Sequence, residues 1–217
     1  MNIACFFVGA PLSGKGTIGR KTMKMLQDRG AQCAYIDTGH RCRLMAETEE
    51  FKHLKPILEA REFVPDRIIM EAVRRELPSK GVVFGDGFPR TDFQAKKLVE
   101  MFRNKAGWTM VLVILNADPD LLLNERLSSR RLTDPHRTDS KLTTTLDGIQ
   151  TYEQVTLPAA KWMAFQPDVH ALHLTVDTHD ASERLTQSVF DHLNRIMHLG
   201  AERLTLHGHH SGAAVLA

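Results

Sequence analysis

The residues best suited to chemistry form one glycine-rich segment near the N-terminus: Gly9-Ala10-Pro11-Leu12-Ser13-Gly14-Lys15-Gly16-Thr17. It follows an apolar run typical of a buried strand, residues 3–8, and it opens a helical pattern at Lys15. The spacing from Gly9 to Gly14-Lys15 is that of a phosphate-binding loop, in which backbone N–H groups and the helix N-terminus face phosphate oxygens. Lysine adds a point charge for the terminal phosphates. The segment predicts that all nine residues bind a nucleoside triphosphate.

The same segment permits a second interpretation. The run from Gly14 to Gly19 also has the spacing G-x-G-x-x-G, and Asp37 ends the next predicted strand, as in a dinucleotide-binding fingerprint. That fingerprint begins directly after its strand, whereas Gly14 lies several residues beyond residue 8. Lys15 also has no role in it. A dinucleotide oxidoreductase is therefore the weaker hypothesis, and binding of NAD(H) would distinguish it.

Arginines recur where a polyanionic substrate would need them. Arg43 and Arg90 each lie beside a glycine or proline turn near a predicted strand end. Arg126 and Arg130 are four residues apart and share a helix face, and Arg137 follows in a polar stretch. A single arginine is usually a surface group in an ion pair. Phosphoryl transfer, however, needs cations from several directions, and guanidinium forks suit phosphate oxygens, so the joint placement indicates such a site.

Five β-rich runs alternate with helical patterns, which predicts a doubly wound α/β fold. The runs are residues 3–8, 33–37, 82–85, 110–115 and 169–176; the helices are 15–29, 91–105, 118–131, 141–165 and 180–198. The stretch 38–80 is too long for one crossover and predicts a helical insertion with breaks at Pro56 and Pro65. The polar stretch 131–141 between two helices is typical of a lid.

From the phosphate loop onward, ordered motifs resemble those of the adenylate kinase family as far as about residue 198. They are the loop itself, Thr38-Gly39-His40-Arg41-Cys42-Arg43, Phe63-Val64-Pro65-Asp66, Asp86-Gly87-Phe88-Pro89-Arg90-Thr91 with Gln94, Glu125 to Arg131, Arg137-Thr138-Asp139, and Tyr152 to Pro158. The resemblance implies a P-loop NTPase fold with a five-stranded parallel sheet in one kinase domain, 1–198. It also implies a nucleoside monophosphate-binding insertion at 38–64 and a short lid at 131–141.

The implied activity is reversible phosphoryl transfer from Mg-ATP to AMP, giving two ADP. By resemblance, Lys15 and the loop amides bind ATP phosphates, and Arg126, Arg130 and Arg137 surround ATP or the transferring group, with Asp139 beside them in the lid. Asp86 would orient water on Mg²⁺. The expected AMP site has seven members: Thr38, Gly39, Arg43, Val64, Gly87, Arg90 and Gln94.

Within that AMP site, Arg43 and Arg90 would hold the phosphate. Thr38 and Gln94 would contact adenine, and Val64 would lie beside the base through its backbone. Two simpler interpretations stay open: Thr38 as a helix N-cap and Gln94 as an ordinary helix-surface amide.

Four positions depart from the family pattern. Leu12 replaces a glycine and would be strained if the loop requires a positive φ. His40 and Ser140 replace aspartates, and Gly148 stands where a further arginine is expected, with Lys141 as a possible substitute. These changes keep two alternatives open: a kinase for another nucleoside monophosphate, or a nucleotide-binding module with weak turnover. The retained arginines argue against the second.

Composition sets the remaining expectations. The 217 residues carry a net charge of +2, with 42% hydrophobic and 25% charged residues, which fits one globular domain without a nucleic-acid or membrane partner. We expect a cytoplasmic monomer, since neither a signal peptide nor a bilayer-spanning stretch is recognisable. The three cysteines lack metal-ligand spacing, and the short lid contains none, so no zinc is expected. Residues 199–217 are expected to form a disordered tail.

Overall fold

The computed structural model describes residues 1–60, 62–133 and 141–208 of the protein. Five strands form one all-parallel sheet in the order β2-β3-β1-β4-β5. They are β1 (Asn2–Gly9), β2 (Cys33–Asp37), β3 (Val82–Asp86), β4 (Trp108–Ala117) and β5 (Val169–Val176). The prediction of a five-stranded parallel sheet is confirmed. β1 is central and buried from Ile3 to Val8, as expected for a strand covered on both faces.

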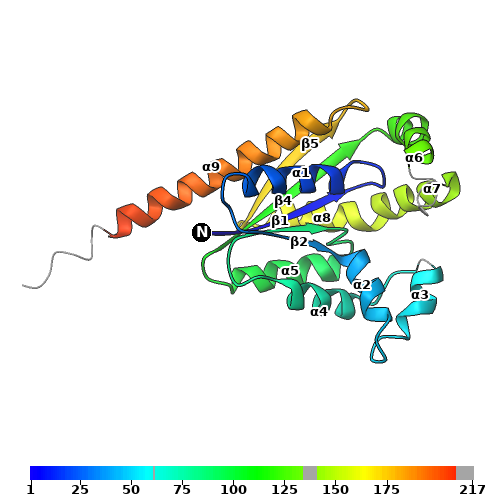
Figure 1. Ribbon diagram of the computed structural model, residues 1–217, viewed down its shortest axis with the longest axis horizontal. Helices are drawn as coiled ribbons and strands as arrows, with labels where there is room; N and C mark the ends of the chain where they lie inside the picture. The colour runs from blue at the N-terminus through cyan, green and yellow to red at the C-terminus, as the bar shows by residue number, and fades with distance from the viewer. Residues whose placement is uncertain (61, 134–140, 209–217) are drawn as a thin grey trace, which may run out of the picture.

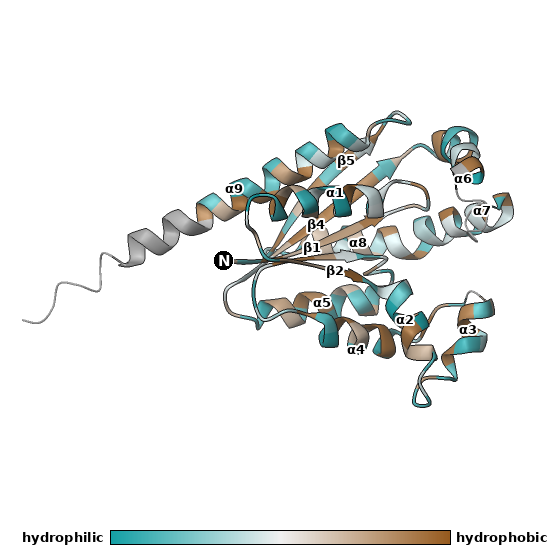
Figure 2. Ribbon diagram, in the orientation of Figure 1, coloured by the Kyte–Doolittle hydropathy of each residue, from teal (hydrophilic) through white to brown (hydrophobic). Residues whose placement is uncertain are grey.

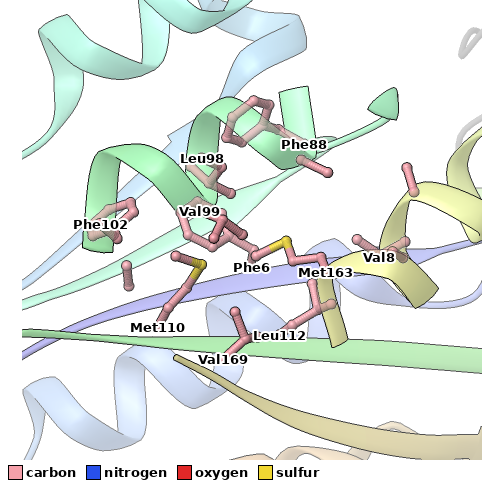
Figure 3. Close-up of a cluster of buried hydrophobic side chains, with 14 of the residues drawn as sticks. Phe6, Val8, Phe88, Leu98, Val99, Phe102, Met110, Leu112, Met163 and Val169 are labelled. Atoms are coloured by element: carbon pink, nitrogen blue, oxygen red, sulfur yellow. The ribbon is translucent and has the colours of Figure 1, made fainter. Parts of the chain in front are cut away.

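Alternate residues of β1 point to opposite faces of the sheet, and each face carries its own core. Phe6 faces α5 (Asp92–Arg103) and α8 (Leu157–Ala164), where Figure 3 shows it among Leu98, Val99, Phe102 and Met163. Phe7 faces α1 (Lys15–Gln27) and α9 (Ser182–Gly208). In Figure 2 the hydrophobic colour follows the strands and the inward sides of these helices. The two cores hold β1, and hence the loop that follows it, in place.

The stretch 38–80 contains α2 (Thr38–Ala46), α3 (Leu54–Ala60) and α4 (Asp66–Glu76), joined by an apolar cluster that includes Cys42, Leu54 and Val64. The predicted break at Pro65 is confirmed, since this residue immediately precedes α4. The predicted break at Pro56 is wrong. Pro56 lies in the first turn of α3, where proline gives up no helical hydrogen bond because the first N–H groups have no partner in the helix.

The helices predicted at 118–131 and 141–165 both contain π-helical segments that the sequence did not indicate. The first comprises η1 (Leu121–Arg126) and α6 (Leu127–Thr133); the second comprises α7 (Leu142–Thr151), η3 (Tyr152–Thr156) and α8. π segments occur frequently at functional sites. The predicted lid residues Arg137 and Asp139, like Ser140, lie outside the described residues.

Helix α9 continues to Gly208, so the predicted helix end at residue 198 is wrong. The ten further residues contain alanine, glutamate, arginine and leucine, which favour helix, and Gly200 in the interior of the helix costs only about 1 kcal/mol. Figure 1 shows the end of α9 projecting beyond the sheet. Within the described part of the chain, no helix has the length and apolar character needed to cross a membrane.

Candidate active site

The predicted site residues gather at the carboxyl ends of three neighbouring strands. β1 ends at Gly9, where the phosphate loop begins, and the register places Phe7 beside Asp86 of β3 and Asp86 beside Asp37 of β2. Figure 1 shows α2, α3, α6 and α7 at this same end of the sheet. This edge is where open α/β sheets bind their ligands.

The phosphate loop has the backbone conformation that its glycines suggest. Gly14 is the N-cap of α1 with φ 91°, and a Cβ atom at Gly9 would lie 2.6 Å from Ser13 Oγ. Lys15 Nζ donates to the carbonyl oxygens of Gly9 and Ala10, both at 2.8 Å. The Ser13 hydroxyl is buried without a hydrogen-bond partner among the described residues. The lysine is thus folded over the loop, within reach of the space in front of the loop amides.

Asp86 lies directly over the start of α1. Its Oδ2 accepts a hydrogen bond from the Tyr35 hydroxyl at 3.0 Å, and it lies 2.9 Å from where a Cβ atom at Gly16 would be. Burial, and then the Asp86 carboxylate, raise the pKa of Tyr35 far above its usual value, so the phenol remains a donor. The sequence analysis missed Tyr35. Its position two residues before Asp37, on the strand that pairs with β3, could have indicated that it reaches Asp86.

Thr38, Gly87 and Arg90 lie together on the other side of Asp86. The Thr38 hydroxyl donates to the Gly87 carbonyl at 3.3 Å, and Arg90 Nε donates to the same oxygen at 2.7 Å. Gly87 has φ 74°, and a Cβ atom there would lie 3.0 Å from Arg90 Nη2. The N-cap of α2 is Asp37, which accepts from the His40 N–H at 2.9 Å, so Thr38 is not the cap.

Arg43 and Arg90 both act electrostatically on Cys42. Burial raises the pKa of Cys42, and the two guanidiniums act in the opposite direction on it. The Arg90 side chain is partly exposed to solvent. Desolvation by the surrounding protein atoms nevertheless lowers the pKa of its guanidinium, and the carboxylates of Asp86 and Asp37 act in the opposite direction. Arg43 also lines a cavity of about 450 Å³ beside edge strand β2. A Cβ atom at Gly39 would lie 3.6 Å from Arg43 Nη1, and Val64 is 8% exposed in the apolar cluster with Cys42 and Leu54.

Arg126 joins the phosphate loop to the segment after β5. Its Nη1 donates to the Leu12 carbonyl at 3.1 Å, and its Nη2 donates to the carbonyls of Thr178 and His179, both at 3.0 Å. Burial lowers the pKa of Arg126, and the nearby Asp180 and Glu125 raise it. Arg130 is half-buried one turn later, on α6. The sequence did not indicate the contacts with Thr178 and His179.

Comparison with known proteins identifies the family. The model of the adenylate kinase family matches residues 7–197. The chain belongs to the adenylate kinase family. An adenylate kinase of Parabacteroides distasonis is 33% identical over 168 residues, which cover 75% of this chain and 83% of that protein. One from Thermus thermophilus is 32% identical over 157 residues (71% and 80%), and one from Phocaeicola vulgatus is 28% identical over 179 residues (80% and 89%).

Family membership favours the phosphate-loop interpretation over the dinucleotide fingerprint, and the geometry agrees with it. Gly14 begins helix α1 five residues after the end of β1 at Gly9, and Lys15 points back over the loop. A dinucleotide fingerprint would place its first glycine immediately after the strand.

Two departures from the adenylate kinase pattern, at residues 12 and 148, meet in one place. Leu12 has φ 65°, so the condition for strain stated above is met, and its side chain is 8% exposed in a cluster with Leu122, Leu127 and Ile149. Gly148 packs so closely on the loop that a Cβ atom there would lie 2.7 Å from Pro11 Cγ. The tip of the loop is therefore pressed against α7 by apolar contacts.

The residues present fit a magnesium ion carried by nucleotide phosphates. Magnesium usually keeps several waters and binds one or two carboxylates, often with a hydroxyl of the phosphate loop. Asp86 supplies a carboxylate next to the loop, oriented by Tyr35, and Thr17 is exposed at the start of α1. Among the described residues, no three His, Cys, Asp or Glu side chains form a cluster that could hold a metal.

Proposed function

We propose that this chain transfers the terminal phosphoryl group of Mg-ATP to AMP, reversibly, giving two ADP. The observation that supports this most is the placement of two separate cationic centres on either side of Asp86. Lys15 and the loop amides lie at the end of β1, and Arg90 is hydrogen-bonded to the Gly87 carbonyl directly after β3, with Arg43 on α2 acting on the same thiol, Cys42, as Arg90. Two polyanions bound there would meet end to end over the Asp86 carboxylate.

The chain's own residues would act by positioning and charge stabilisation, as phosphoryl transfer requires. Lys15 would exchange the carbonyls of Gly9 and Ala10 for phosphate oxygens. Arg43 and Arg90 would hold the AMP phosphate so that one of its oxygens attacks the γ-phosphorus in line, without a covalent intermediate. Magnesium, when bound with ATP, would neutralise developing charge on the phosphates. Asp86 would orient its water ligands.

The remaining predicted contacts follow from the same arrangement. Thr38 and Val64 would lie beside the AMP base, with Gly39 and Gly87 leaving room for the nucleotide. Arg126, Arg130 and Arg137 would approach ATP or the transferring group, with Asp139 in the lid. We expect the insertion, 38–64, and the lid, 131–141, to close over both substrates and exclude water. The remaining expectations are a cytoplasmic monomer and a site without zinc.

A coupled assay with Mg-ATP and a panel of acceptors tests the proposal. AMP-dependent formation of ADP, with much weaker use of CMP, UMP, GMP and dTMP, is the expected result. Preference for another monophosphate would keep the mechanism and reject AMP as acceptor. Measurable ATP binding without turnover of any acceptor would favour the nucleotide-binding module, which the glycine at residue 148 keeps as a second candidate.

The variant Arg90→Ala tests the division into two centres. Removing one preorganised donor from a phosphoryl-transfer site typically lowers the rate by about 100-fold to 1,000-fold. We expect kcat/KM for AMP to fall by about that factor while the Kd for ATP changes by less than about twofold. Arg103→Ala is the matched control, because Arg103 is exposed and pairs with Asp168 on the surface. An equal loss of ATP affinity in Arg90→Ala would refute the assignment.

A further inference from the structure

Gln94 does not have the environment of an exposed amide. Its side chain is 2% exposed, and both ends of the amide are hydrogen-bonded. Nε2 donates to Asp66 Oδ1 at 2.8 Å, and Oε1 accepts from the backbone N–H of Arg90 at 2.7 Å. A carboxylate only accepts and a backbone N–H only donates, so the amide has one possible orientation.

The carbonyl group of Arg90 is held in the same way from another helix. Thr156, which is 8% exposed and ends the π segment η3, donates its hydroxyl to the Arg90 oxygen at 3.0 Å. Arg90 is thus bonded at its N–H by Gln94, at its C=O by Thr156 and at its Nε by the Gly87 carbonyl. One local side-chain hydrogen bond, from Gln94, and one long-range bond, from Thr156, fix a single residue that lies between β3 and α5.

We propose that Asp66, Gln94 and Thr156 form a backbone clamp whose function is to position the Arg90 guanidinium for the acceptor phosphate. Asp66 begins α4 directly after the insertion, and Thr156 lies on the helical run that follows the lid. The clamp therefore joins the helical segments that follow the insertion, 38–64, and the lid, 131–141, to one cation. Within the clamp, Gln94 acts through Arg90 on the phosphate. This inference rests on the proposed role of Arg90.

Small displacements at such a site have large effects. A shift of about 1 Å in a positioned group can lower the rate by about 100-fold. Loss of the Thr156 or Asp66 hydrogen bond leaves Arg90 present but free to move, so we expect a smaller loss than in Arg90→Ala. A decrease of about 10-fold in kcat/KM for AMP is the expected size for Thr156→Val and Asp66→Ala.

Conservative variants separate positioning from simple destabilisation. Thr156→Ser keeps the hydroxyl and Asp66→Asn keeps an Oδ1 acceptor, so both should retain most of the AMP activity that Thr156→Val and Asp66→Ala lose. Thr151→Val is the matched control, since the Thr151 hydroxyl donates to Asp147 one turn away and not to Arg90. ATP affinity and the AMP-to-CMP preference should stay within about twofold of wild type in every variant.

Three results would overturn the clamp: equal losses in Thr156→Val and Thr156→Ser, a changed AMP-to-CMP preference in Asp66→Ala, or unchanged hydrogen exchange of the Arg90 amide in Gln94→Met. Hydrogen exchange of the Arg90 amide gives a readout that does not depend on activity. That N–H should be protected in wild type and exchange at least about 10-fold faster in Gln94→Met. A wild type inactive towards AMP would refute the proposed function alone, and the unchanged exchange of Arg90 in Gln94→Met would refute the clamp alone.

Discussion

Leu12 combines a strained backbone with a buried side chain. Substitutions at this residue compare the free energy cost of the strain with the stabilisation that the apolar packing provides. Its φ of 65° lies in the left-handed region, which costs an L-residue about 1–2 kcal/mol. Its side chain is 8% exposed among Leu122, Leu127 and Ile149, and removing a buried leucine side chain costs about 2–5 kcal/mol. The two terms act in opposite directions, and the packing term is the larger.

Two substitutions separate the terms. Leu12→Ala loses the packing and keeps the strain, so it should destabilise the protein by about 2–3 kcal/mol, the lower part of the range for a small cluster. Leu12→Gly loses the packing and also relieves the strain. Glycine adds about 0.4–1 kcal/mol of unfolded-state entropy, so the glycine variant should be about 0.5–1 kcal/mol more stable than the alanine variant.

Urea unfolding of the ligand-free protein measures this difference. Two variants of Lys97, which is exposed in the middle of α5, serve as the control for the two Leu12 variants. In an ordinary helix, Lys97→Gly should be about 1 kcal/mol less stable than Lys97→Ala. The sign of the glycine–alanine difference should therefore reverse between residues 97 and 12. If Leu12→Gly were the less stable variant of its pair, residue 12 would not be strained in solution.

Three further predictions concern the surroundings of the loop. Gly148→Arg should destabilise the protein without raising kcat, because the Cβ atom of the new side chain would lie 2.7 Å from Pro11 Cγ. A variant with wild-type stability and a higher kcat would contradict the close packing. Gly16→Ala should raise the Mg²⁺ concentration needed for half-maximal rate, because the methyl group would lie 2.9 Å from Asp86 Oδ2, and an unchanged Mg²⁺ dependence would separate Asp86 from the metal. Burial raises the pKa of Tyr152 to about 12 and that of Tyr35 further, from an ordinary value of 10.0. The unfolded chain therefore loses tyrosine protons first, and stability falls as the pH rises from 10 towards 12. Absorbance at 295 nm should show no tyrosinate in the native protein at pH 10 and about half ionisation of both tyrosines in urea.

Many of the elements follow from local sequence. The apolar runs, the glycine-rich loop and the helix patterns are encoded by residues close together in the chain, and the five parallel strands were predicted from them. The comparison of Leu12 with the glycine of the family pattern raised the question of a positive φ there, and the structure has one, because backbone conformation is a local property. The boundaries were less certain, and helix α9 exceeds its predicted end because no strong stop follows residue 198.

Only the tertiary structure decided how the site residues are held. Tyr35 reaches Asp86 across 51 residues, Gln94 reaches Asp66 across 28, and Thr156 reaches Arg90 across 66. No local pattern contains these partners, because each hydrogen bond depends on strand order, helix packing and the π segment that presents Thr156. The sequence by itself predicted which cations would bind two phosphate groups. The fold decided which of those cations are fixed, and through which neighbours, because positioning is a property of contacts between distant segments.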